Sequence, residues 1–205
     1  LSGLVGSEMC IRDRHLSLAF IILGLLFKTL LDYLADRKII FVSKYIPIRS
    51  NLSFFLMILI FLQIAYGAFV SGTHSGLLYN TWPMYNGKLF ADFDNDQIRG
   101  IINLFENGEI IIFFHRTSAF LILIFVFYIN YDAYQKRVNH LGAVLLISFN
   151  IILIFQIILG VLMTYQNIPW HLALAHQGNS IILYLLVISI WFINKKPPLK
   201  FKRGS

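Results

Sequence analysis

The chain has 205 residues, of which 58% are hydrophobic and 13% charged, and its formal net charge is +7. A soluble domain is usually about 45–50% apolar and about 25% charged, so this composition excludes an ordinary soluble protein and indicates an integral membrane protein. The positive charge does not imply nucleic-acid binding, because the basic residues lie where membrane topology places them.

Residues 1–14 (LSGLVGSEMCIRDR) form neither a good membrane span nor a recognisable signal peptide. Residues 3–14 resemble translated sequencing-adapter read-through, so we expect this stretch to be non-native and exclude it from the fold. Native sequence is expected to resume at Arg14 or His15. The lone Cys10 lies in this stretch, so disulfides are expected to play no part.

Five apolar segments are long enough to cross a bilayer, which takes roughly 20 residues per helix. They are residues 15–34, 53–71, 109–131, 141–165 and 170–193. The sequence has no alternating ten-residue pattern typical of a membrane barrel. It therefore predicts an all-α membrane protein with five transmembrane helices, joined by loops that include a long one at residues 72–108.

The distribution of basic residues predicts the orientation. Eleven of the 17 Lys and Arg residues lie on one side of a five-helix zigzag: four in residues 36–51, two in 132–140 and five after 193. The positive-inside rule puts this side in the cytoplasm, including the loop 35–52 and the basic tail 194–205. The loop 72–108 then lies outside, where Asp92, Asp94, Asp96 and Glu106 make it acidic.

Three histidines share one depth in this topology. Each lies 17 to 19 residues before a charged residue at the inner end of its segment, with Lys28 set aside as able to reach the inner surface: His15, His115 and His176. At 1.5 Å per residue, all three lie about 25–29 Å above the inner edge. A histidine at membrane depth is costly unless something satisfies it.

His115 and His176 are the predicted ligands of one metal or one haem iron, since bundle cores build cofactor sites from facing helices. A haem iron held by two imidazoles has no free position and is suited to passing electrons. The alternative is that each histidine bonds a neighbouring group. For His15 the alternative to a ligand is a helix-start histidine facing water. Arg116 meets either a haem propionate or the lipid headgroups, and the sequence leaves both open.

The remaining histidines receive no role. His74 and His171 lie at the outer boundary, where solvation is expected, and His140 lies on the cytoplasmic side.

Two internal repeats relate the segments. The pattern His-x-x-x-Ala-Phe occurs at His15–Phe20 and again at His115–Phe120. The pattern Gln-x-x-x-Gly occurs at Gln63–Gly67 and again at Gln156–Gly160. Repeated helices with a ligand in equivalent positions indicate a duplicated bundle. The five helices then correspond to the last helix of a first four-helix half, at residues 15–34, and a complete second four-helix bundle, at residues 53–193.

Seven short motifs carry a resemblance to a known family. They are HLSLAF at 15–20, GAFVSG at 67–72, YNTWPM at 79–84, NLFEN at 103–107, the pair His115-Arg116, QIILG at 156–160 and ALAHQ at 173–177. Together they resemble heme A synthase of alphaproteobacteria and mitochondria, and YNTWP with the two histidine motifs is the specific part. Some members carry cysteine pairs in their outer loops; the absence of such pairs here places the chain with the cysteine-free group.

The resemblance implies an oxidoreductase of eight helices in two related halves. Such an enzyme oxidises the C8 methyl of heme O to a formyl group and so makes heme A for cytochrome oxidase. It implies a haem b between His115 and His176, with Arg116 beside the cofactor. It also implies that the substrate heme O binds at His15, whose partner histidine lies on an earlier helix absent from this N-terminally truncated chain.

Localisation and partners follow from the same resemblance. It implies a multi-pass protein of the bacterial inner membrane with a cytoplasmic C-terminus. The expected partners are the lipid bilayer, heme O synthase and the cytochrome oxidase assembly machinery, with a homo-oligomer as a further expectation. No residue identifies the electron acceptor. The alternative function is a b-type cytochrome subunit that passes electrons between a quinone and a partner without modifying haem.

Overall fold

The structure is a computed structural model that describes residues 2–39, 50–85, 87–88, 90 and 107–195. The acidic cluster of the outer loop, the motif at 103–106 and the basic tail beyond 195 lie outside the described residues. The described part is nearly all helical. It consists of α1 (Ser2–Asp36), α2 (Ser50–Gly72), α3 (Ser75–Leu78), α5 (Gly108–Gln135), α6 (His140–Tyr165) and α7 (Trp170–Lys195).

Five of the described helices are long and apolar enough to cross a membrane, which confirms the predicted all-α fold with five transmembrane helices. Most observed helices extend the predicted segments by one to four residues, because polar residues at the membrane surface continue the helical hydrogen bonds. Helix α1 is the exception, since it begins at Ser2 and not at His15. The apolar span within it runs from His15 to Asp36.

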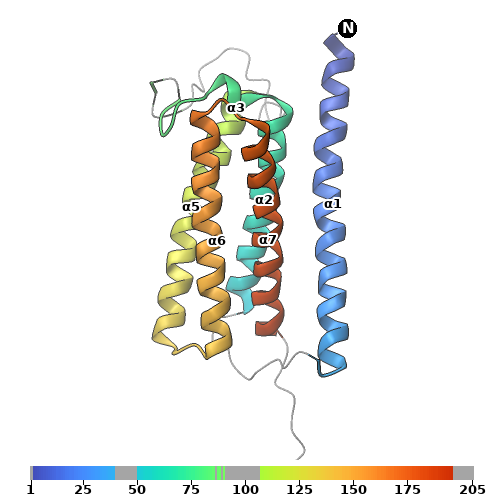
Figure 1. The fold of residues 1–205 in the computed structure, drawn as a ribbon, viewed down its shortest axis with the longest axis vertical. Coiled ribbons are helices and arrows are strands. Elements are labelled where there is room, and N and C mark those ends of the chain that lie inside the picture. The colour runs from blue at the N-terminus through green and yellow to red at the C-terminus, as the bar shows by residue number, and fades with distance from the viewer. Residues whose placement is uncertain (1, 40–49, 86, 89, 91–106, 196–205) are drawn as a thin grey trace, which may run out of the picture.

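Four helices form the bundle, and α1 lies outside it. Helix α2 packs against α5 and α7, and α6 packs against α7 and, over a shorter stretch, against α5. Helices α5 and α7 therefore occupy one diagonal of the bundle, and α2 and α6 occupy the other. Helix α1 runs along one side, against α2 and α7 (Figure 1).

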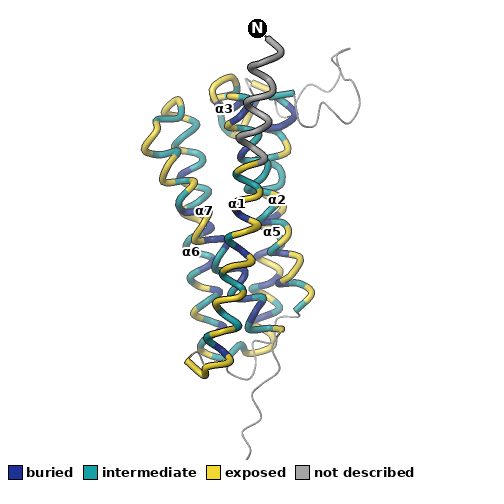
Figure 2. Tube along the Cα trace, turned by 90° about the vertical axis from the view of Figure 1, so that its right-hand side faces the viewer, coloured by how far each residue is buried: buried dark blue, intermediate teal, exposed yellow. Residues whose placement is uncertain are grey.

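The core of the bundle is apolar, and so is much of its outer surface. Phe149 of α6 and Val187 of α7 are completely buried in the core. Exposed residues recur along α1 and the outer faces of the bundle (Figure 2), and they include large apolar side chains such as Leu25, Phe127 and Ile151. Such surfaces are unfavourable in water and suit contact with lipid.

Asparagine side chains begin two of the bundle helices. The side chain of Asn107 accepts hydrogen bonds from the backbone N–H groups of Glu109 and Ile110 at the start of α5. Asn139 accepts one from the N–H of Gly142 at the start of α6. Asparagine is a favoured residue at this position because its side chain satisfies backbone donors that lack a helical partner. These caps fix the residues at which α5 and α6 begin.

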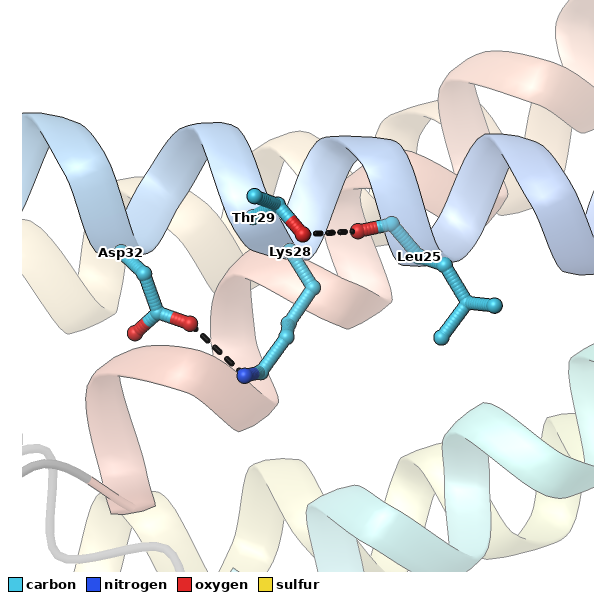
Figure 3. A network of polar contacts seen from close by, with 4 residues as sticks. All are labelled: Leu25, Lys28, Thr29 and Asp32. Atoms are coloured by element: carbon cyan, nitrogen blue, oxygen red, sulfur yellow. Dashed lines mark hydrogen bonds and ion pairs between the residues drawn. The ribbon is translucent and has the colours of Figure 1, made fainter.

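The C-terminal part of the apolar span in α1 holds an ion pair. The Nζ of Lys28 lies 2.7 Å from the Oδ2 of Asp32, one turn nearer the inner end, and Thr29 Oγ1 donates to the carbonyl of Leu25 at 2.8 Å (Figure 3). Pairing lowers the cost of a charge inside a membrane. The ammonium of Lys28 thus extends toward the inner end of α1, the direction expected from the sequence.

A reciprocal pair of amides joins α5 to α6. Asn130 Nδ2 donates to Asn150 Oδ1 at 3.1 Å, and Asn150 Nδ2 donates to Asn130 Oδ1 at 2.8 Å. Asn130 Nδ2 also donates to the carbonyl of Val126. Because these two helices contact each other over only a short stretch, the amide pair supplies much of their specific attachment.

We expect Asn130→Leu and Asn150→Leu each to destabilise the folded protein by about 1 kcal/mol, the range measured for side-chain hydrogen bonds between membrane helices. Each single variant leaves the remaining amide without its partner. The free energy of unfolding in detergent is the measurement. The double variant should lose less free energy of unfolding than the two single variants lose together. Strictly additive losses would show that the two amides act independently.

Candidate functional site

His115 and His176 lie on the diagonal helices α5 and α7 at matching heights. His115 is seven residues from the start of α5, and His176 is six residues from the start of α7. The two imidazoles lie near enough to each other that protonated forms of both would repel. Each histidine keeps partial exposure within the bundle. The fold thus brings together the two histidines that the sequence predicts as ligands.

The His115 imidazole is held in place by a side chain of α2. Gln63 Nε2 donates to the backbone carbonyl of His115 at 2.8 Å and lies 3.2 Å from its Nδ1. Ser118 Oγ donates in turn to Gln63 Oε1. This side-chain network restricts the rotation of the His115 ring, as partners of a ligating histidine commonly do.

The second imidazole is held from α6 in a similar way. The backbone of Gln156 lies against the His176 ring, and Asn179 Nδ2 donates to Gln156 Oε1 at 2.7 Å. The Nδ1 of His176 is buried and, among the described residues, has no hydrogen-bond partner of standard geometry. This nitrogen faces α6, where the backbone of Gln156 is its neighbour, so Nε2 is the nitrogen of His176 that would be left for a bound group.

Two imidazoles from facing helices are the residues that would hold a haem iron in this bundle. No group of three or more His, Cys, Asp or Glu side chains within the described part of the chain is arranged to hold a metal ion. A haem supplies its other iron ligands from its own ring nitrogens, and with two imidazoles it would be suited to passing electrons.

The guanidinium of Arg116 binds the outer loop. Its Nη2 donates to the carbonyl of Tyr79 at 2.7 Å, and its Nη1 donates to the carbonyls of Thr81 at 2.8 Å and Met84 at 3.4 Å. The guanidinium carbon also lies 5.0 Å from the centre of the Tyr85 ring. The structure thus gives Arg116 a set of partners that the sequence did not indicate, and a contact with a haem propionate stays a prediction.

The same loop is tied to α6 and to the turn after it. Tyr165 Oη donates to the carbonyl of Trp82 at 2.9 Å, and Asn80 Nδ2 donates to Asn167 Oδ1 at 3.0 Å. We call residues 79–85 the outer strap, because they run between the outer ends of α5 and α6. The YNTWPM motif of the sequence therefore forms a fixed connection and does more than place Trp82 at the membrane surface.

The strap is also bound to the start of α5. Tyr79 Oη donates to Glu109 Oε2 at 3.3 Å. Burial and the neighbouring Glu109 carboxylate raise the pKa of Tyr79 above its usual value of 10.0, so its hydroxyl remains a donor in neutral solution.

The other histidines lie apart from this pair. His15 is exposed on α1, outside the four-helix bundle. His74 has a left-handed backbone, with φ of 53°, and precedes α3 without capping it through its side chain. His171 lies beside Trp170 at the start of α7, and His140 begins α6.

Comparison with known proteins identifies relatives of the chain. Residues 2–188 match the COX15-CtaA family, described as cytochrome oxidase assembly protein. Over 182 residues the chain is 37% identical to a heme A synthase of Pelagibacter ubique (strain HTCC1062), covering 87% of the chain and 50% of that relative. Over 190 residues it is 35% identical to a heme A synthase of Wolbachia pipientis wMel, covering 89% and 51%.

A third relative is a heme A synthase of Wolbachia pipientis subsp. Culex pipiens (strain wPip), which is 34% identical over 173 residues, covering 83% of the chain and 49% of the relative. The chain spans about half the length of the curated relatives it matches. No solved structure matches the chain at a significant level.

Proposed function

Because the chain belongs to the COX15-CtaA family of cytochrome oxidase assembly proteins, we propose that it serves heme A synthesis, with His115 and His176 as the two axial ligands of a haem b. The observation that carries this proposal is the pairing of these histidines. They come from diagonal helices at one height, and a glutamine of the preceding helix lies against each.

The proposed reaction converts the C8 methyl of the substrate heme O to a formyl group in successive oxidations, as the family resemblance implies. The haem b, when bound by two imidazoles, supplies electron transfer and no oxygen binding. The residues of this chain hold and orient that group: the histidines provide neutral nitrogen donors, and Gln63 and Gln156 limit how the rings turn.

His15 is the proposed contact with the substrate. It lies on the exposed face of a helix outside the haem b bundle, so a second haem there would be separate from the first. Arg116 is the proposed partner of a haem propionate, in addition to its bonds to the strap. The proposed setting is the bacterial inner membrane, with the C-terminus in the cytoplasm and with heme O synthase and the oxidase assembly machinery as partners.

The reduced-minus-oxidised visible spectrum of the detergent-purified protein, with the extracted haem identified, tests the cofactor. We expect a low-spin spectrum and haem b in the extract. Protein that is helical by circular dichroism but free of haem would overturn the proposal.

The haem content of cells that also make heme O synthase tests the reaction. Accumulation of heme A supports heme A synthesis. Haem b in the protein with heme O left unchanged would instead support the electron-transfer subunit.

A further inference from the structure

The Gln-x-x-x-Gly repeat of the sequence is part of a larger repeat in space. On α2, Gln63 is followed four residues later by Gly67. On α5, His115 is followed three residues later by Ser118, whose hydroxyl donates to the Gln63 side chain. The glycine therefore lies on the same pair of helices as the ligand and its hydrogen-bonded support.

Helices α6 and α7 carry the second copy. Gln156 is followed four residues later by Gly160, and His176 is followed three residues later by Asn179. The Asn179 amide donates to the Gln156 side chain, just as Ser118 donates to Gln63. Each copy thus joins one histidine helix to the long helix that comes before it in the chain, α2 to α5 and α6 to α7.

Both glycines face the edge of the imidazole in their own copy. A methyl group placed on Gly67 would lie 3.2 Å from Cε1 and 3.8 Å from Nδ1 of His115. One placed on Gly160 would lie 3.2 Å from Cε1 and 3.7 Å from Nδ1 of His176. Carbon atoms in good contact are about 3.5–4.0 Å apart, so even alanine would push each ring.

The same geometry orients the ring nitrogens. In each copy Cε1 and Nδ1 are the ring atoms within 4 Å of the glycine position, and Nε2 lies farther away. The Cε1–Nδ1 edge of each ring therefore faces the helix that carries the glycine, and Nε2 is the nitrogen farther from that helix. An imidazole that ligates iron through Nε2 needs this arrangement, because a group beside Nδ1 sets the tautomer and the ring angle.

We propose that Gly67 and Gly160 are positioning residues that set the rotation of the two ligand imidazoles and thereby the axial geometry of the haem. The proposal rests on the proposed function, since it assumes that His115 and His176 hold a haem. Glycine weakens a helix relative to alanine, and a glycine within an apolar helix calls for a packing reason. The ring contact supplies that reason in both copies.

The test compares three alanine variants of the haem-loaded protein. Gly67→Ala and Gly160→Ala place a methyl against a ligand ring. Gly178→Ala is the matched control, because it lies on α7 two residues from His176 and its added methyl meets nothing within 4 Å. We measure haem per protein, the low-spin electron paramagnetic resonance g-values and the midpoint potential.

We expect shifted g-values and lower haem occupancy in Gly67→Ala and Gly160→Ala, with Gly178→Ala like the unaltered protein. A merely structural role would reduce the amount of folded protein and leave the g-values of the remaining haem unchanged. Wild-type g-values and occupancy in both ring-facing variants would overturn the inference. If the unaltered protein itself holds no haem, it is the proposed function that fails.

A second measurement replaces the histidine side chain with free imidazole, which is not attached to the backbone. In His115→Gly, we expect added imidazole to restore the low-spin spectrum. Adding Gly67→Ala should weaken imidazole binding about fivefold or more, because the methyl occupies space that the ring edge needs. Adding Gly178→Ala should not weaken it. Equal imidazole affinity in all three backgrounds would overturn the positioning role even if Gly67→Ala alone fails to fold.

Discussion

Replacing either His115 or His176 with alanine is expected to abolish the low-spin haem b spectrum. Losing only the outer partners of a metal ligand typically lowers affinity about 10- to 100-fold, so losing the ligand itself should lower haem content by at least about tenfold. The two variants should behave alike, because the sites are equivalent in depth and in the glutamine that lies against each ring.

Haem per protein and the visible spectrum of detergent-purified variants provide the measurement. His171→Ala is the matched control, since this exposed histidine lies on the same helix as His176 but outside the pair. His15→Ala should also retain haem b while impairing the handling of heme O. Unchanged haem content in both ligand variants would refute the ligand assignment, and equal loss in His15→Ala would argue against two separate haem sites.

Much of the fold was predictable because a membrane imposes a simple requirement on length and polarity. The apolar runs placed five helices to within a few residues, with α1 the exception. Counting residues from the inner charges also predicted that His115 and His176 share a height. The fold adds that α5 and α7 are diagonal neighbours across the bundle, which residue counting alone does not determine.

The polar details were harder to predict. Ser118 lies three residues after His115, and Asn179 lies three residues after His176. This repeated hydrogen-bond donor is visible in the sequence but was not predicted as part of the site. The repeated glutamines and glycines were visible in the sequence, but their partners were not. The bonds from Arg116 to the outer strap were not predictable at all, because backbone carbonyls accept hydrogen bonds whatever their side chains and leave no pattern in the sequence.

The outer strap depends on Arg116, and its removal should have the second large effect. The guanidinium binds the carbonyls of Tyr79, Thr81 and Met84 at once and stacks on Tyr85. We expect Arg116→Ala to lower the free energy of unfolding by about 1.5–3 kcal/mol, the range for hydrogen bonds to a charged group. Arg116→Lys should recover little of this, because an ammonium lacks the planar fork that reaches several acceptors.

Chymotrypsin cleavage after Tyr79 or Tyr85, measured together with thermal unfolding, tests this expectation. Arg37→Ala is the matched control: Arg37 also lies over a tyrosine ring, at 5.4 Å from that of Tyr33, but is exposed at the opposite end of the molecule. Arg37→Ala should lower the free energy of unfolding by no more than about 0.5 kcal/mol. Faster cleavage in both Arg116 variants and not in the control establishes Arg116 as the anchor of the strap. A shifted haem potential in Arg116→Ala with no change in cleavage would instead assign Arg116 to a haem propionate, because only the cofactor would then have lost a charge partner.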